Sequence, residues 1–222
     1  MGFSPGEKTL EESPRPFRLI LASASPRRRE LLTQAGYSFS IEAADIDESQ
    51  RADESPSQYV RRLAEEKAHA VFNKCSPGGP SIRPRGMSGG QELSKPLIVL
   101  GADTTVVLDN AILGKPADAA DATRMLRALS GRTHQVLTGI AAVTRAGLTS
   151  AVESTDVTFS EIPEAEIDAY CTTSEPLDKA GAYGIQGYAA RWIPRIDGCY
   201  FNVMGLPIAR TVALLRGAAA KF

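Results

Sequence analysis

The sequence predicts an α/β protein organised around one mixed β-sheet. Short apolar runs alternate along the chain with segments that carry helix caps and helical periodicity, a pattern typical of α/β folds. Residues 133–159 are instead rich in β-forming residues on both sides of one turn, which predicts an antiparallel pair of strands. At 222 residues, of which 43% are hydrophobic, the chain can bury a substantial core.

The first strand and helix lie at residues 17–35. The run "FRLILAS" (17–23) predicts a buried strand, and Ser25, followed by proline, predicts the cap of a helix that ends before Gly36. The first turn of that helix holds three arginines, Arg27, Arg28 and Arg29. A helix N-terminus is already positive, so each cation there costs about 0.3–1 kcal/mol. We therefore expect an anion to bind at this turn.

The next segment combines a strand, an acidic loop and a long helix. "YSFSIEA" (37–43) predicts a second strand, and "ADIDES" (44–49) follows it as an acidic loop. Ser55, a proline and Gln58 form a capping box, which predicts a helix from there to about Phe72.

Two stretches predict no regular structure. Residues 1–16 are polar and lack the apolar centre of a signal peptide, and we expect a disordered polar tail. Residues 73–96 hold five glycines and four prolines, which favours an exposed, poorly ordered loop inserted into one domain that spans 17–222.

The second half of the chain continues the alternation of strands and helices. A strand at 97–100 is expected to deliver the residues "GADTT" at its carboxyl end, and Asp118 caps a helix that ends at Leu129 before Gly131. The remaining predicted elements are two strands joined at 145–147, a helix at 163–172, a glycine-rich loop "DKAGAYGIQG" (178–187), a hairpin around Asp197 and Gly198, and a helix at 207–219.

Composition and charge exclude several classes of protein. The 25 basic and 26 acidic residues nearly balance, which argues against a nucleic-acid-binding or membrane-surface protein. The three cysteines are far apart and form no CxxC pair, so neither a disulfide framework nor a zinc knuckle is indicated. No stretch reaches the ~18 apolar residues of a membrane span. We expect a cytoplasmic protein in a reducing compartment.

One lysine lies on the apolar side of a predicted helix. Lys67 falls in the middle of the stripe formed by Val60, Leu63, Ala64 and Val71. An unpaired ammonium in a protein core is very costly. Either the side chain extends past the stripe to water, or it points into a cleft that holds an anion.

Two clusters of oxygen-bearing side chains suit a hard cation. Asp103 and the neighbouring Thr104 follow a predicted strand, although an aspartate there is often only a turn residue. Asp45, Asp47 and Glu48 form the second cluster, for which a solvated loop is the alternative. Mg²⁺ commonly takes one or two carboxylates together with phosphate oxygens, so the two clusters together are compatible with such an ion.

Several familiar site motifs are absent. Lys115 lies in "GKPAD", where proline replaces the Ser or Thr of a P-loop, and the chain has no GxGxxG motif. His69 and His134 are the only histidines, which gives little support to a histidine metal site or a Ser-His-Asp triad. The glycines of the 178–187 loop are expected to let the backbone approach a ligand closely.

Seven stretches, in order, resemble the signatures of a known family. They are "LASASPRRREL", "EEKA", "GADTTVVLD", "GKPAD", "LSGRTHQVLTG", "EPLDKAGAYGIQG" and "NVMGLPIA". They resemble the Maf family of nucleoside triphosphate pyrophosphatases over roughly residues 17–215. The resemblance implies an elongated α/β fold with two lobes around a central cleft, similar to inosine triphosphatase. It also implies a homodimer that uses a divalent cation, Mg²⁺ or Mn²⁺.

The resemblance further implies an activity and its residues. The "DKAGAYGIQG" stretch is similar to the branch that hydrolyses dTTP and UTP to the monophosphate and pyrophosphate. Asp103 matches the family's acid-base residue, and the other matching active-site positions are Glu48, Lys67 and Lys115. Positions tied to substrate choice are matched by Arg27, Thr104 and Gln186.

The expected site also includes metal ligands and further substrate-binding residues. Glu48 and Asp103 would hold the metal, while Ser25 and Arg28 join the substrate-binding set and Arg29 is expected at the surface. Arg83 and Arg85, in the inserted loop, are expected in solvent, with a phosphate contact as the alternative.

Two other functions are compatible with the sequence. One is a nucleotide-binding regulator of cell division that uses the same cleft without turnover, a role also linked to the family. The other is hydrolysis of 7-methyl-GTP. The full set of acidic and basic positions favours an enzyme, and release of pyrophosphate from dTTP would distinguish it from a binding protein.

Overall fold

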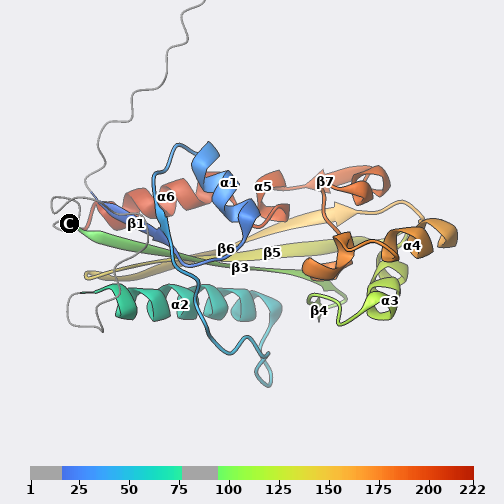
Figure 1. Ribbon diagram of the computed structural model, residues 1–222, viewed down its shortest axis with the longest axis horizontal. Coiled ribbons are helices and arrows are strands. Elements are labelled where there is room, and N and C mark those ends of the chain that lie inside the picture. Colours follow the sequence, from blue (N-terminus) through green and yellow to red (C-terminus); the bar gives the residue numbers. More distant parts are fainter. Residues whose placement is uncertain (1–16, 77–94) are drawn as a thin grey trace, which may run out of the picture.

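A seven-stranded mixed sheet runs the length of the computed structural model, which describes residues 17–76 and 95–222 (Figure 1). The strands lie in the order β2-β1-β3-β5-β6-β7, and β4 pairs with one end of β3. β1 is parallel to both of its neighbours, whereas all other pairs are antiparallel. The predicted mixed sheet is therefore confirmed.

The strands are β1 (Arg18–Leu21), β2 (Ser40–Ile41), β3 (Leu97–Leu108), β4 (Ala111–Leu113), β5 (Thr133–Thr144), β6 (Gly147–Thr158) and β7 (Arg195–Asp197). The α-helices are α1 (Pro26–Gln34), α2 (Pro56–Cys75), α3 (Ala119–Leu129), α4 (Glu164–Cys171), α5 (Tyr200–Val203) and α6 (Ile208–Ala219). Three short 3-10 helices, η2 (Glu175–Asp178), η3 (Ala180–Ala182) and η4 (Tyr188–Trp192), form the glycine-rich region.

The predicted helix caps are confirmed. Ser25 accepts a hydrogen bond from a backbone N–H in the first turn of α1, and Asp118 does the same for α3. Ser55 and Gln58 form the capping box of α2, which runs three residues beyond the predicted end at Phe72. Most of the predicted 73–96 loop, with Arg83 and Arg85, lies outside the described residues, as does the 1–16 tail.

Two sequence predictions are wrong. β3 does not end before "GADTT" but continues to Leu108, because the threonines and valines of this stretch favour a strand and pair with β5 through Val107. Asp103 therefore lies in the middle of a strand. No hairpin forms at Asp197: Gly198, at φ 125°, leads from β7 directly into α5, and the next N–H, from Cys199, bonds to Thr155 on β6.

The helices cover the sheet on both faces, as Figure 1 shows. α2 lies along one face against β3 and β5, while α5 and α6 pack on the opposite face. One hydrophobic core joins β1 and the N-terminal half of β3 to α1 and α6. Another joins the C-terminal end of β3 to α3, α4 and the 3-10 helices. These two cores are the predicted two lobes. Among the described helices none has the length and apolar character of a membrane span.

Two glycines bring α2 unusually close to the sheet. A Cβ atom on Gly101 of β3 would lie 2.1 Å from the carbonyl oxygen of Ala64, and one on Gly139 of β5 would lie 2.1 Å from that of Val60. Any side chain at either position would push the helix away. The close approach also sets how deep Lys67, on the same helix, sits against the strands.

We predict that Gly139→Ala lowers the free energy of unfolding by about 1–3 kcal/mol, because the added methyl group overlaps the α2 backbone. Gly217→Ala is the control: a Cβ there has no atom within 4 Å, and alanine in an exposed helix is expected to stabilise by about 0.5–1 kcal/mol. Denaturant unfolding measures both. Equal stability of the two variants would contradict the close-packing account.

His134 is a neutral core residue. Its side chain is buried on β5, its Nε2 lies 2.7 Å from the Tyr183 hydroxyl, and its ring packs edge-on against Phe159. Burial lowers the pKa of His134 from 6.5 to about 4. In the unfolded chain the imidazole takes up a proton below about pH 6.5, whereas in the folded chain it does so only near pH 4.

Acid therefore favours the unfolded state through this residue. We predict that the free energy of unfolding falls by about 3 kcal/mol from His134 alone as the pH drops from 6.5 to 4. His134→Gln should remove this part of the pH dependence, while the exposed His69→Gln should leave it intact. Urea unfolding at a series of pH values makes the comparison, and an unchanged slope in His134→Gln would refute the assignment.

Candidate functional site

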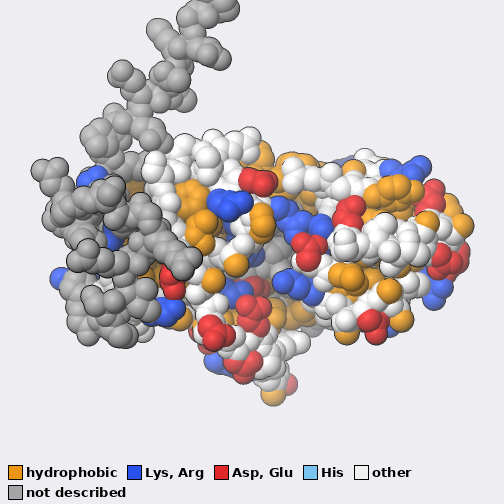
Figure 2. Space-filling model, viewed as in Figure 1, with side chains coloured by type: hydrophobic (Ala, Val, Ile, Leu, Met, Phe, Trp, Pro, Cys, Tyr) orange, Lys and Arg blue, Asp and Glu red, His pale blue; other side chains and the backbone are white. Residues whose placement is uncertain are grey.

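A cleft of about 900 Å³ separates the two lobes. In Figure 2 basic side chains gather around the hollow in the middle of the face shown. The cleft is lined from the β1–α1 turn, β3, α2 and the glycine-rich region. It brings together every candidate site residue predicted from the sequence, namely Ser25, Arg27, Arg28, Glu48, Lys67, Asp103, Thr104, Lys115 and Gln186.

The charged centre of the cleft is one ammonium between two carboxylates. The Nζ atom of Lys67 lies 2.7 Å from Oδ1 of Asp103 and 2.8 Å from Oε1 of Glu48. The side chains of Lys67 and Asp103 are each only 10% exposed, whereas that of Glu48 is 56% exposed. The ammonium does not extend to water but lies in the lining of the cleft, between two carboxylates of the protein itself. That the cleft also holds an anionic ligand stays a prediction.

Asp103 has an environment that changes its acidity. It lies opposite Gly139 of β5, on the side of β3 that faces α2. Burial raises the pKa of the Asp103 carboxyl above its ordinary value, and the positive charges of Lys67 and Arg28 oppose that rise. A buried carboxylate with a raised pKa accepts a proton more readily than an exposed one, which is a property of general bases.

Arg28 braces the walls of the cleft. Its guanidinium donates hydrogen bonds to the carbonyl oxygens of Gly205 and Ala102 and to the hydroxyls of Ser23 and Thr104, at 2.9–3.2 Å. Four of its five N–H groups are thus bonded within the chain. The main structural role of Arg28 is therefore to join the start of α1 to β3 and to the α5–α6 turn, and a phosphate contact through the remaining N–H stays a prediction.

The other two arginines differ from Arg28 in their surroundings. Arg27 is partly exposed in the cleft wall, with Nη2 at 3.7 Å from the Asp178 carboxylate. Arg29 is exposed, which confirms its predicted place at the surface. Of the three cations at the start of α1, Arg27 is the one best placed to meet a ligand.

The predicted hydroxyl groups already have partners. The Oγ atom of Ser25 accepts the N–H of Arg28 as the cap of α1. The Oγ1 atom of Thr104 accepts a hydrogen bond from Arg28 and lies 3.0 Å from that of Thr138. Both residues line the cleft, and their roles in substrate binding stay predictions.

The sequence interpretation missed a further lysine of the cleft. Lys179 lies in the glycine-rich region with Nζ at 2.6 Å from both the Glu175 carbonyl oxygen and the Asp178 carboxylate. Its side chain passes over Gly184, where a Cβ would lie 2.8 Å from Cε of the lysine. A lysine among closely spaced glycines, as in "DKAGAYG", is the signal that would have identified it.

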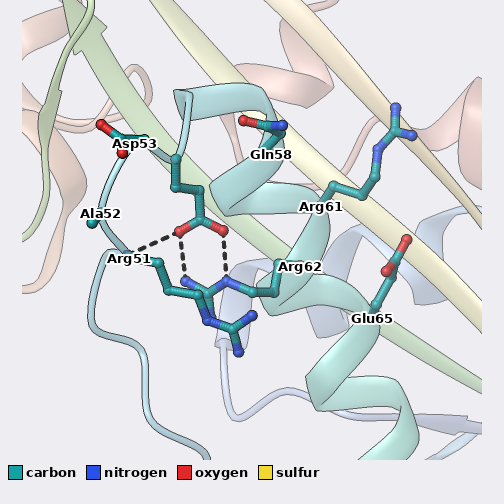
Figure 3. Close-up of a pocket in the computed structure, with 8 residues that line it drawn as sticks. Arg51, Ala52, Asp53, Gln58, Arg61, Arg62 and Glu65 are labelled. Carbon is teal, nitrogen blue, oxygen red and sulfur yellow. Dashed lines mark hydrogen bonds and ion pairs between the residues drawn. The ribbon is translucent and has the colours of Figure 1, made fainter.

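A second, smaller hollow lies at the start of α2 and is shown in Figure 3. It is open to solvent and is lined by a network of charged side chains that includes Arg51 and Arg62. Within residues 17–76 and 95–222, no group of three or more acidic, histidine or cysteine side chains is arranged to hold a metal ion. The predicted metal site therefore rests on Glu48 and Asp103 alone.

Comparison with known proteins gives close relatives. A dTTP/UTP pyrophosphatase of Hahella chejuensis is 48% identical over 199 residues, which cover 90% of this chain and 91% of the relative. A protein of the same name from Koribacter versatilis is 48% identical over 200 residues, covering 90% of this chain and 94% of the relative.

A solved structure described as the Ham1 protein of Staphylococcus aureus aligns with 90% of this chain and 99% of its own, at 13% identity and a TM-score of 0.42. That likeness is too distant to carry a conclusion about the fold. The family model described as "Maf-like protein" matches residues 18–218, nearly the whole described structure. This chain therefore belongs to the Maf family.

Proposed function

We propose that this protein is a nucleoside triphosphate pyrophosphatase that hydrolyses dTTP and UTP to the monophosphate and pyrophosphate. The observation that carries the proposal is the contact of Lys67 with Asp103 and Glu48 inside a cleft rimmed by further cations. The relatives that share nearly half of its residues are named for the same reaction.

The cleft has the charge to bind a triphosphate. Such a ligand brings about four negative charges, which charge-assisted hydrogen bonds from Arg27, Lys67 and Lys115 would balance. The positive N-terminal end of α1 lies at the same wall. The cost of placing arginines at a helix start is then offset when the nucleotide is bound.

The acidic residues fit a divalent cation that arrives with the nucleotide. Glu48 and Asp103 supply only oxygen donors, and both carboxylates line the same cleft, where each also contacts the ammonium of Lys67. Mg²⁺ and Mn²⁺ accept one or two carboxylates with phosphate oxygens and water. When bound, such a cation would neutralise charge on the phosphate oxygens.

The chain itself supplies a base for the reaction. Asp103 is buried beside the cleft and is the group we assign to orient the attacking water and to accept its proton. The water oxygen forms the new bond to the α-phosphorus, and the bond to the bridging oxygen breaks, so pyrophosphate leaves. Lys67, in contact with Asp103, holds that carboxylate in place.

Recognition of the base is assigned to the glycine-rich region. Gln186 is exposed at the rim of the cleft, and its amide can both donate and accept hydrogen bonds, as the edge of a pyrimidine requires. We further propose that residues 17–222 form a single domain and that the protein is a homodimer. We also propose that it is located in the cytoplasm, where nucleotide pools lie.

A hydrolysis panel tests the proposed function. The protein with Mg²⁺ or Mn²⁺ should release pyrophosphate from dTTP and UTP faster than from 7-methyl-GTP or ATP. Asp103→Asn should abolish turnover and still bind dTTP, because the amide keeps the size of the carboxyl but cannot act as a base. Binding of dTTP without product in the natural protein would favour the cell-division regulator, and fastest hydrolysis of 7-methyl-GTP would overturn the choice of substrate.

Arg27 is predicted to act on the ligand and not on the fold. Arg27→Ala should raise the Kd for dTTP about tenfold, the effect of losing roughly 1.4 kcal/mol of binding. Because a cation leaves the positive end of α1, the free energy of unfolding should be unchanged or slightly higher. Arg29→Ala, in the same turn but exposed, is the matched control and should leave dTTP binding unaltered; similar binding losses in both variants would argue against a specific contact.

A further inference from the structure

Glu48 lies on an irregular segment of the chain. Between the end of β2 at Ile41 and the start of α2 at Pro56 the chain forms no strand or helix. The Glu48 side chain is more than half exposed, yet its carboxylate reaches the ammonium of Lys67. No regular ladder of backbone hydrogen bonds fixes its position, so contacts between the segment and the rest of the protein become important.

Two such contacts come from adjacent turns of α2. The hydroxyl of Tyr59 donates a hydrogen bond to the backbone oxygen of Glu48 at 3.0 Å, and Nη2 of Arg62 donates one to the backbone oxygen of Ser49, also at 3.0 Å. Successive carbonyl groups are thus bound to the helix that carries Lys67. The distance from Glu48 to Lys67 depends on this attachment.

Arg62 is itself fixed by a paired interaction with Glu54. The Glu54 carboxylate accepts hydrogen bonds from Nε of Arg62 at 2.6 Å and from Nη2 at 2.8 Å, and the two side chains are only 12% and 8% exposed. Nη1 of the same guanidinium bonds to Glu66 at 3.1 Å. Figure 3 shows Arg62 turned toward the loop and the neighbouring Arg61 turned away from it.

Glu54 also closes the segment on itself. Its carboxylate accepts the backbone N–H of Arg51 at 3.2 Å, and its backbone oxygen accepts a hydrogen bond from the Gln50 side chain at 3.1 Å. The hydrogen bonds with Arg62 lower the pKa of Glu54, so the pair stays ionised near neutral pH. One guanidinium thus joins both ends of residues 49–54 to α2.

We propose that Arg62 and Glu54 form a lock that holds Glu48 opposite Lys67, which makes Arg62 a positioning residue for hydrolysis. The inference rests on the role proposed above for Glu48. A bidentate arginine pair with little exposure holds a fixed geometry, unlike an exposed ion pair that exchanges with water. Lysine in place of Arg62 would keep the charge but could not make the two parallel hydrogen bonds.

Steady-state kinetics with dTTP provide the first test. Arg62→Ala, Arg62→Lys and Glu54→Gln are each expected to lower kcat about 10–100-fold, the loss typical when the support of a ligating side chain is removed, with KM changed less than about threefold. Arg61→Ala is the matched control, since it removes an exposed arginine from the adjacent helix position, and should keep the natural kcat. Natural kcat in all three lock variants would overturn the proposal.

A double-mutant cycle distinguishes positioning from a general loss of structure. If Arg62 acts only through Glu48, adding Arg62→Ala to Glu48→Gln should lower kcat less than about twofold further. Losses that multiply in full would show that Arg62 acts elsewhere and would overturn the lock. Should Arg62→Ala fail to fold, Glu54→Gln takes its place in the cycle.

Hydrogen exchange separates the lock from the proposed reaction. Arg62→Ala should speed backbone exchange in residues 48–54 and leave α3 at the natural rate, whether or not the protein hydrolyses dTTP. Unchanged exchange in 48–54 would overturn the lock. Faster exchange there in a protein whose natural form releases no pyrophosphate would instead retain the lock and reject the proposed function.

Discussion

The buried contact between Lys67 and Asp103 is the constraint on which the rest of the structure depends. A lysine or an aspartate alone at this depth would lose the hydration of its charge, and each makes the burial of the other tolerable. The contact requires α2 to lie almost on the backbone of the sheet, which Gly101 and Gly139 permit. It also leaves room for Glu48 to join the same ammonium from the open side.

Local chemistry explains why so much of the fold could be predicted. Helix starts are marked by Ser25, Ser55 and Asp118, whose side chains bond within three residues of their own position. The strands of the β5–β6 pair are likewise marked by a turn between them. The threonines and valines after Asp103 favour a strand, but where β3 ends depends on its pairing with β5. The course of the chain after Asp197 depends on contact with Thr155, which is far away in the sequence.

The site residues also differ in whether local sequence or contacts between distant parts of the chain reveal their roles. Lys67 is visible in the sequence because a charge interrupts an apolar stripe, and the "GADTT" stretch marks Asp103. The bracing role of Arg28 depends on Gly205, 177 residues away, and that of Arg62 on how an irregular segment folds back onto α2. From the sequence, Arg28 is predicted only as a substrate-binding cation, and no motif marks Arg62 as part of the site. The sequence thus indicates the charged groups of the cleft, while the structure shows what holds them.

In the proposed enzyme, the groups of the cleft direct water to the α-phosphorus of a nucleoside triphosphate. The most direct test is hydrolysis of dTTP in water enriched in ¹⁸O, followed by mass spectrometry of both products. The account predicts one ¹⁸O atom in the dTMP and none in the pyrophosphate, because the new bond forms at the α-phosphorus. Label in the pyrophosphate, with unlabelled dTMP, would contradict it.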